Sequence, residues 1–535
     1  MDATAPPETL RTVKSAVEMK AARNEDEILL HCQNRAVSYA ELDRNANAIA
    51  NNLRAQGIEK GDVVCLFMYN CPEYISLFFA LAKIGAVAAP IDTRFRDETL
   101  AYALSQSDAT TIFIDAKTRP EYESVTASVP NITREYLVDE TATDHPYRAF
   151  STLLEGDSTS TPSTTVEPSD PVAVIYVQRN ATERPKGVVL PHYSYINTGW
   201  EACENLFDFT EDDRIFTTLP LYSIFTFQIG IIGTLLADAV FILAGQFDPS
   251  QFWDQIESYD ATVFLYLSRM LSVLHNQDER PTNSETPAEM AIGHSFGFTT
   301  DEAMFRTLEE RFDITILEGY GVTPATIATY NRPDDRRLGS VGKEASYVEL
   351  EIVDGDDWPV PPGETGEIVV RPTEPHTMMQ GYYGQPEATT EAFRNQWLHT
   401  GGIGYKDEDG YLHFVANRDN SIYRGRIDGR ISSLEIESVI DAQPGVRQSS
   451  VVGVTNEGGS EEIKAFVVPE EDADITPIDI CRRCERQLPY LKVPRYIEIR
   501  DEFPRSPSGK IRKQDLKAEG TVDAWDRKSG YELSR

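Results

Sequence analysis

The chain has 535 residues, 41% of them hydrophobic, and its 50 basic and 86 acidic side chains give a formal net charge of −36 at pH 7. This length exceeds what one compact core supports, so we expect at least two domains and room for a deep ligand pocket. The charge excludes nucleic acid as a partner, because neutralising phosphates takes clustered Lys and Arg.

The acidic residues are spread along the whole chain, without a polyacidic tail. This distribution predicts an acidic surface suited to a high-salt cytoplasm, because repulsion between charges is screened within about 3 Å at 1 M salt. An ordinary protein with one acidic patch facing a partner is the alternative. The first residues, MDATAPPETLRTVKS, lack a basic start followed by an apolar core, so we expect no signal peptide.

The first regular pattern begins at Ser38. Ser38 with Glu41 three residues later fits a capping box, and Leu42, Ile49 and Leu53 then recur at helical spacing. Short apolar runs alternate with helical patterns after it, which predicts βαβ units and a parallel sheet covered by helices. The expected strands are residues 63–68, 86–91, 111–114, 215–218, 240–243 and 263–267, and a helix is expected at residues 72–84.

Two stretches interrupt this alternation. Residues 151–170 are rich in Ser, Thr, Pro and acid and have no periodicity, which indicates a surface loop. Residues 229–245 are the most apolar of the chain, but Asp238 and several glycines break them. They predict a buried helix followed by a strand, not a membrane span.

The texture changes after Gly339, where short alternating strands at residues 348–353 and 367–370 predict a β-rich subdomain. The end of the chain predicts a compact αβ unit. Its expected elements are a helix at residues 433–441, strands at 450–454 and 464–468, and a helix near 478–488. That last helix carries Cys481 and Cys484, and a single CxxC without a nearby His favours reduced thiols over a metal site.

The expected fold class is therefore α/β. A large N-terminal domain, residues 1–417, combines βαβ-built sheets covered by helices with the β-rich subdomain. A small, mobile αβ domain, residues 418–535, follows it, and we expect the active site between the two.

A polar loop inside residues 175–190, IYVQRNATERPKGVVL, is the first candidate for ligand binding. In nucleotide enzymes such a loop places backbone N–H groups and a lysine around a phosphate. Here the loop holds Thr182 and Lys186 but almost no glycine. A lone lysine between Pro and Gly is usually a solvated turn residue, so this stretch alone favours no function.

Several ordered motifs together resemble the adenylate-forming superfamily of the acyl-CoA synthetase (AMP-dependent synthetase and ligase) type. They run in the order of that family from about residue 37 to residue 517 and read VSYAELDRNANAIANNLRAQGIEKGD, ALAKIGAVAAPID, GYGVT, DRRLGSVGK, PPGETGEIVVR, GYYGQPEATTEAFRNQWLHTGGIGYKDEDGYL and LKVPRYIEIRDEFPRSPSGKIRKQDLK. Because they cover nearly the whole chain, they are far more specific than any one of them.

The resemblance implies a two-step reaction with ATP, Mg²⁺ and coenzyme A. A carboxylate attacks the α-phosphate of ATP to give an acyl-adenylate and pyrophosphate, and the thiol of coenzyme A then takes the acyl group. The implied residues are Lys510 for catalysis at the α-phosphate, Thr182, Lys186, Tyr320, Thr323 and Arg418 for the nucleotide, and Tyr222, Phe225 and Phe296 for a hydrophobic, fatty-type acid.

One loop and three single positions depart from the motifs of that family. The loop residues 178–183 lack the glycines of its phosphate loop and include Glu183, whose carboxylate opposes phosphate charge. Pro324 stands where the family holds Mg²⁺ with a glutamate, Gly402 where an aspartate binds the ribose, and Ser223 where many members have histidine.

These departures leave two hypotheses. The favoured one is an AMP-forming acid–thiol ligase that is cytoplasmic and acts on a small-molecule carboxylic acid. The alternative is a catalytically impaired relative that binds an acyl ligand, nucleotide or coenzyme A, or that partners a true synthetase. The motifs determine neither the acid nor the oligomeric state.

Overall fold

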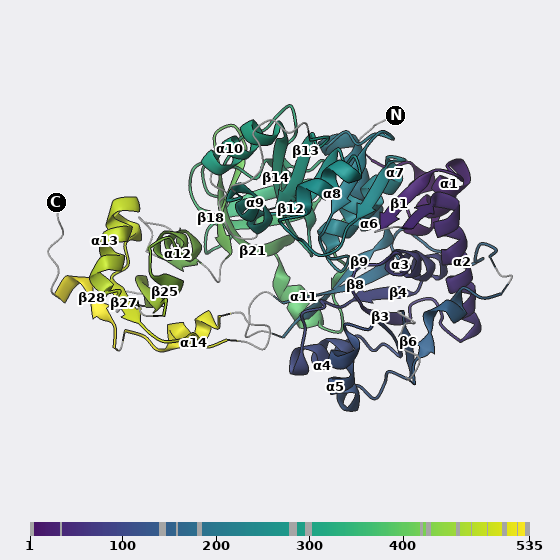
Figure 1. Cartoon of the computed structure of the whole chain (residues 1–535), viewed down its shortest axis with the longest axis horizontal. Helices are drawn as coiled ribbons and strands as arrows, with labels where there is room; N and C mark the ends of the chain where they lie inside the picture. The colour runs from purple at the N-terminus through teal and green to yellow at the C-terminus, as the bar shows by residue number, and fades with distance from the viewer. Residues whose placement is uncertain are drawn as a thin grey trace.

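The computed structural model describes residues 5–32, 35–138, 146–156, 159–178, 184–277, 286–294, 302–417, 421–423, 430–455, 461–471, 473–488, 490–505, 511–521 and 523–529. Helices and strands alternate through most of this length. The segment from residue 421 onward lies to one side of the rest (Figure 1). No helix in these ranges is both long and apolar enough to cross a membrane.

A nine-stranded sheet has the order β16-β15-β14-β13-β12-β10-β11-β1-β2. Its strands are β1 (Ile28–Cys32), β2 (Arg35–Ser38), β10 (Arg214–Thr217), β11 (Val240–Leu243), β12 (Val263–Leu267), β13 (Met290–His294), β14 (Thr315–Val322), β15 (Thr326–Tyr330) and β16 (Lys343–Glu344). The six strands from β1 to β14 pair in parallel, while β2, β15 and β16 pair antiparallel at the two edges.

An eight-stranded sheet has the order β19-β9-β8-β4-β3-β5-β6-β7. Its strands are β3 (Val63–Phe67), β4 (Val87–Pro90), β5 (Thr111–Ile114), β6 (Arg134–Leu137), β7 (Arg148–Ala149), β8 (Pro171–Val177), β9 (Lys186–Pro191) and β19 (Gly381–Tyr382). The hairpin β8–β9 is antiparallel and pairs Val177 with Lys186, on the two sides of the polar loop.

Eleven α-helices are described before residue 393. They are α1 (Val13–Arg23), α2 (Tyr39–Ala55), α3 (Pro72–Ile84), α4 (Asp97–Gln106), α5 (Arg119–Val125), α6 (His192–Trp200), α7 (Gly233–Leu236), α8 (Phe252–Ser258), α9 (Ser268–His275), α10 (Glu302–Phe312) and α11 (Pro386–Ala392). Two π-helical turns, Glu201–Leu206 and Thr226–Ile232, extend α6 and precede α7. The predicted helix-then-strand interpretation of residues 229–245 is confirmed, because β11 follows α7.

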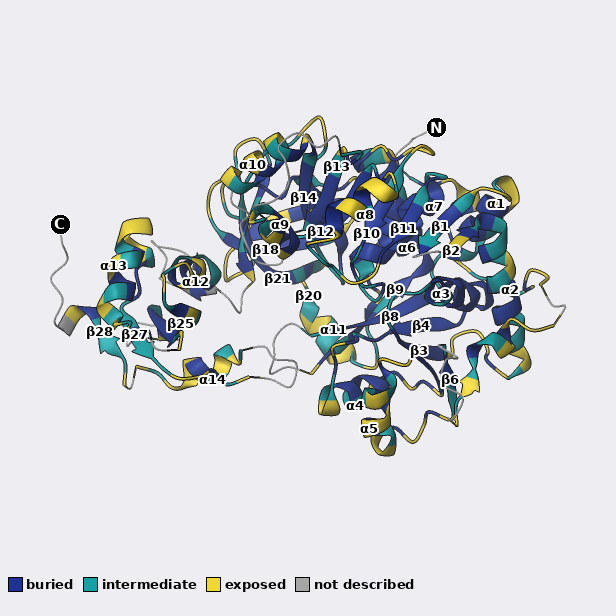
Figure 2. Ribbon diagram, in the orientation of Figure 1, coloured by how far each residue is buried: buried dark blue, intermediate teal, exposed yellow. Residues whose placement is uncertain are grey.

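The position of α3 follows from its sequence. Pro72 occupies the first turn, where a missing N–H costs nothing, and Gly85 ends the helix in the left-handed conformation at φ 71°. The helix is buried on nearly all sides (Figure 2) because it packs between the two large sheets. Alternate residues of β3 therefore face different cores: Val64 and Leu66 point toward α3, while their neighbours point toward α4 and α5.

The predicted β-rich subdomain is a five-stranded antiparallel sheet. Its strands are β17 (Val348–Val353), β18 (Gly366–Pro372), β20 (Phe393–Arg394), β21 (Trp397–Lys406) and β22 (Leu412–Asn417). The hairpin β21–β22 carries the HTGG stretch and ends at Asn417, directly before the predicted boundary at residue 418.

The described residues from 421 onward form the predicted αβ unit. A two-stranded sheet, β23 (Ser421–Tyr423) and β24 (Arg430–Ser432), precedes a four-stranded sheet of β25 (Val446–Thr455), β26 (Glu461–Pro469), β27 (Tyr496–Ile499) and β28 (Trp525–Asp526), with helices α12 (Ser433–Asp441), α13 (Pro477–Gln487) and α14 (Lys513–Ala518). Thr476 and Asp479 form a capping box at the start of α13. Cys481 and Cys484 lie buried on this helix as free thiols, as predicted.

Candidate active site

Five of the nine predicted site residues belong to the described part of the chain: Lys186, Tyr222, Phe225, Tyr320 and Thr323. The other four, Thr182, Phe296, Arg418 and Lys510, lie outside the described residues, as does Glu183. The roles assigned to all nine residues remain predictions.

Tyr320 lies on β14, where that strand turns back into β15. Its ring is 5% exposed and stacks on Phe414 of β22, with ring centroids 5.2 Å apart. Its hydroxyl donates a hydrogen bond to Thr400 Oγ1 at 2.9 Å. Gly319 and Gly321 flank the tyrosine because there is no space for a side chain: a Cβ would lie 2.3 Å from the Tyr330 ring at 319 and 2.3 Å from a backbone oxygen at 321.

The structure explains why position 402 is a glycine, which the sequence context does not. A Cβ at this position would lie 2.2 Å from Tyr320 Oη and 3.0 Å from Tyr320 Cζ. Its backbone N–H donates to Thr400 Oγ1 at 3.0 Å, and Thr400 donates in turn to the carbonyl of Ile368 at 2.7 Å. The hydroxyl of Tyr320 thus fills the volume next to Gly402, so glycine is required there by space.

Thr323 and Pro324 form the half-buried tip of the β14–β15 hairpin. The turn is closed by a hydrogen bond from Ala325 N to the carbonyl of Val322 at 2.8 Å, and Met379 N donates to the carbonyl of Pro324 at 2.9 Å. Pro324 offers no side-chain ligand to a metal ion. Within the described ranges, no group of three or more His, Cys, Asp or Glu side chains is arranged to hold one.

Lys186 is the first residue of β9, directly after the candidate phosphate loop. Its ammonium group lies over the ring of Tyr382 of the neighbouring strand β19, 5.3 Å from the ring centroid. Gly187 follows it because a Cβ there would lie 2.8 Å from the side chain of Val174. The hairpin therefore fixes the lysine at the mouth of the loop.

Tyr222 and Phe225, predicted to contact the acid, lie in the segment before the π-helical turn at 226. Phe225 is 6% exposed and makes an edge-to-face contact with His294, with ring centroids 4.9 Å apart. Burial lowers the pKa of His294 to about 4, so the imidazole is neutral at pH 7. Burial and the charge of Asp92 raise the pKa of Tyr222, so its hydroxyl stays neutral too.

Sequence reasoning missed His294. It is the last residue of the parallel strand β13, and its backbone carbonyl accepts a hydrogen bond from Ser268 Oγ at 3.3 Å. The available signal was its position, because ligands of parallel sheets bind outside the carboxyl ends of the strands. Phe225 and this neutral imidazole therefore form an uncharged wall.

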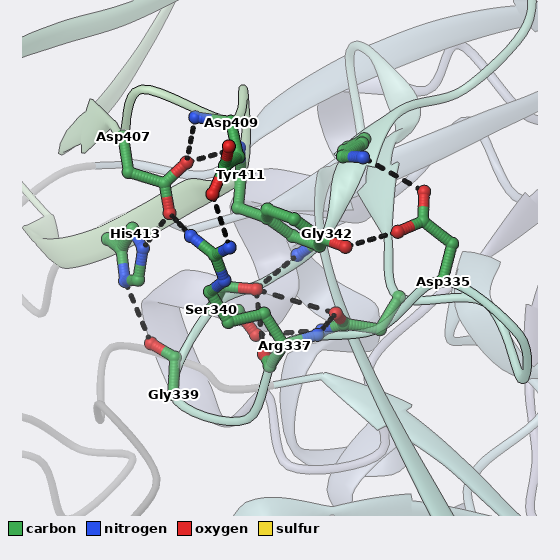
Figure 3. Close-up of polar contacts among 11 residues, drawn as sticks. Asp335, Arg337, Gly339, Ser340, Gly342, Asp407, Asp409, Tyr411 and His413 are labelled. Carbon is green, nitrogen blue, oxygen red and sulfur yellow. Dashed lines mark hydrogen bonds and ion pairs between the residues drawn. The ribbon is translucent and has the colours of Figure 1, made fainter. Parts of the chain in front are cut away.

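A polar network braces the β21–β22 hairpin against the loop between β15 and β16 (Figure 3). Arg337 donates to both Asp407 and Asp409, the second at 2.6 Å. His413 lies 3.0 Å from Asp407 through Nε2 and 3.1 Å from the carbonyl of Gly339 through Nδ1. Burial alone would raise the pKa of Asp407, but the hydrogen bonds it accepts lower that pKa to about 2.

The same network has a second half on the other side of Arg337. Tyr411 donates to Asp335, and Lys343 donates to the same carboxylate at 2.9 Å. Arg337 and Lys343 both lie over the Tyr411 ring, each 4.4 Å from its centroid. The hairpin that ends one residue before Arg418 is therefore held by charged groups from a loop about 70 residues earlier in the chain.

Comparison with known proteins agrees with this architecture. Residues 17–383 match the model of the AMP-binding enzyme family, and residues 435–510 match the AMP-binding enzyme C-terminal domain. The crotonobetaine/carnitine–CoA ligase of Salmonella agona (strain SL483) is 34% identical over 488 residues, which cover 90% of this chain and 93% of the ligase.

Solved structures give the same result for the fold. The anthranilate–CoA ligase AuaEII in complex with anthranoyl-AMP superposes with a TM-score of 0.82 at 23% identity, covering 98% of this chain and 99% of the ligase. ATP-bound MatB from Rhodopseudomonas palustris superposes with a TM-score of 0.80 at 25% identity, covering 95% and 99%. The chain therefore belongs to the AMP-binding enzyme family, as a relative of the adenylate-forming acyl-CoA ligases.

Proposed function

We propose that this protein activates a hydrophobic carboxylic acid with ATP to an acyl-adenylate and transfers the acyl group to coenzyme A. The observation that carries the proposal is the continuous match to CoA ligases over 90% of the chain, in a segment order that retains Lys510 within SPSGKIRK. A chain that had lost the reaction would have no reason to keep this lysine and its surroundings.

The resemblance to acyl-CoA synthetases implies a task for each residue. Negative charge accumulates on the α-phosphate as the carboxylate attacks, and Lys510 stabilises it. Thr182 and Lys186 contact the leaving pyrophosphate, Thr323 binds the α-phosphate, Tyr320 stacks on adenine and Arg418 contacts the ribose. The position of Lys186 at the mouth of the loop and of Thr323 at a hairpin tip supports these roles.

The residues at position 324 and around it do not fit a protein-held Mg²⁺. Pro324 has no ligand atom in its side chain, and its carbonyl already accepts the N–H of Met379 at 2.9 Å. Mg²⁺ is commonly bound through substrate phosphates and waters rather than by a protein cage. We therefore derive no step from a metal ion fixed by this chain.

The uncharged wall that Phe225 and His294 form through their ring contact supports an apolar acyl group as substrate. A hydrocarbon chain gains about 25 cal/mol per Å² of apolar surface that it buries against such a wall.

The acidic surface supports the proposal that the protein functions in a high-salt cytoplasm. Five helical segments are followed by an aspartate in the left-handed conformation: Asp108, Asp208, Asp238, Asp260 and Asp313. Glycine is usual there, and a carboxylate interacts unfavourably with the negative end of the helix dipole. Asp238 is paired with Lys20 at 2.7 Å. For the other four, molar salt screens that repulsion, so this choice of residue is least costly in concentrated salt.

The second candidate, a binding protein without adenylation activity, is favoured by Pro324 and by the filled volume at Gly402. Acyl-CoA and AMP formation, measured by mass spectrometry in molar KCl with Mg²⁺ and acids from acetate to palmitate, crotonobetaine and carnitine, separates the two. We expect a medium or long apolar acid to give both products. Tight acid or CoA binding without products would favour the second candidate.

A further inference from the structure

Thr326, three residues after Thr323, has an unusual backbone conformation. Its φ is +60°, in the left-handed region, and it is the only β-branched residue there among the described residues. That conformation brings the Cβ of an L-residue close to a carbonyl oxygen, and a β-branched side chain makes it a genuine outlier. Such strain persists where the surrounding structure imposes it, and it concentrates at functional sites.

The side chain of Thr326 is held on two sides. It is 6% exposed, and its hydroxyl donates to the carbonyl of Ala325 at 2.6 Å. The same hydroxyl lies 2.9 Å from the hydroxyl of Tyr347, a fully buried ring in the segment before β17. The Tyr347 hydroxyl also lies 3.4 Å from Thr198 Oγ1 of α6 and 3.1 Å from the carbonyl of Ile327.

These contacts tie the hairpin turn to two other parts of the fold. Through Tyr347, Thr326 connects the turn to α6, and through the N–H of Met379 the carbonyl of Pro324 connects it to the segment before β19. The tip residue Thr323 stays half-buried and accessible between these anchors. Glycine would take φ +60° without strain, so the hydroxyl, and not the backbone, explains a threonine at 326.

We propose that Thr326 and Tyr347 are positioning residues, which hold the β14–β15 turn so that Thr323 meets the α-phosphate of ATP. This inference rests on the proposed function of Thr323. A glycine at 326 would relieve the strain but release the turn from Tyr347, and the phosphate contact would then have to be ordered at the moment of binding.

The test compares Thr326→Gly, Thr326→Ser and Tyr347→Phe with Thr329→Val as the matched control. Thr329 is also a buried β15 threonine, whose hydroxyl donates to the carbonyl of Val341 at 2.6 Å, away from the turn. We expect Thr326→Gly and Tyr347→Phe to raise KM for ATP up to about tenfold, the effect of losing one ordered hydrogen bond, with KM for coenzyme A unchanged.

Thr326→Ser keeps the hydroxyl and is expected to keep KM for ATP within about twofold, while Thr329→Val lowers the melting temperature without changing that KM. Unchanged KM for ATP in both Thr326→Gly and Tyr347→Phe would overturn the inference. Calorimetric Kd values for ATP give the same comparison if the wild type turns over no acid, which would reject the proposed function alone. A wild type that binds no ATP would overturn both.

Discussion

Gly402→Asp is the change that the family motif invites, since it would restore the carboxylate that binds ribose in relatives. The structure predicts that this substitution destabilises the fold. The new Cβ would lie 2.2 Å from Tyr320 Oη, well inside the closest approach of real atoms, so Tyr320 must move and lose its hydrogen bond to Thr400. Overpacking costs about 1–3 kcal/mol. The lost buried hydrogen bond adds roughly 1 kcal/mol, so we expect a total destabilisation of about 2–4 kcal/mol.

The assay is urea unfolding of the wild type, Gly402→Ala and Gly402→Asp, together with KM for ATP. Gly402→Ala carries the same Cβ without the charge and should account for most of the destabilisation. Combining it with Tyr320→Phe removes the Oη atom but leaves Cζ 3.0 Å away, so we expect partial recovery. If Gly402→Asp keeps its unfolding midpoint and lowers KM for ATP, then steric exclusion does not explain Gly402. The chain would then have lost only the ribose-binding carboxylate at this position.

Three further predictions concern the stability of the fold. Asp260→Gly should stabilise the protein by about 1 kcal/mol in low salt, because it relieves a left-handed aspartate at the end of α8; melting curves should show the gain shrinking toward molar KCl, and a gain that grows with salt would contradict it. Burial lowers the pKa of His192 to about 3, so the unfolded chain takes up a proton before the folded protein does. The free energy of unfolding therefore falls by up to about 1.4 kcal/mol per pH unit as the pH drops below 6.5. His192→Gln should flatten this slope in urea titrations, and an unchanged slope would refute the assignment. Lys83 is fully buried and pairs with Asp43 at 2.7 Å and Glu18 at 3.1 Å, so Lys83→Met should cost about 3–5 kcal/mol by leaving carboxylates unpaired; a stable variant would mean that water reaches the pair.

Elements with strong local signals could be predicted closely from the sequence. The helix expected at residues 72–84 is α3, because Pro72 and Gly85 mark its ends and its apolar residues fill every turn. The strands expected at 111–114, 240–243 and 263–267 are β5, β11 and β12, whose buried runs allow little else. The order of motifs also gave the family, since each is a local string of residues.

Features that depend on contacts between distant segments could not be predicted. In the sequence, Gly402 indicates only a missing aspartate. The structure shows that Tyr320, about 80 residues earlier, occupies the space beside it. His294 has no motif of its own and gains meaning only from its contact with Phe225. The strain at Thr326 is a backbone property, and its sequence neighbours GYGVTPAT give no sign of it.

The central claim is that this chain adenylates an acid and that Lys510, which lies outside the described residues, is essential for that step. The direct measurement is carboxylate-dependent exchange of labelled pyrophosphate into ATP, in molar KCl with Mg²⁺ and a panel of short to long acids. Lys510→Ala is compared with Lys517→Ala, a surface lysine of α14 paired with Glu461. We predict exchange that Lys510→Ala abolishes and Lys517→Ala retains. A folded protein that exchanges nothing with any acid, or one in which both variants exchange equally, would contradict the account.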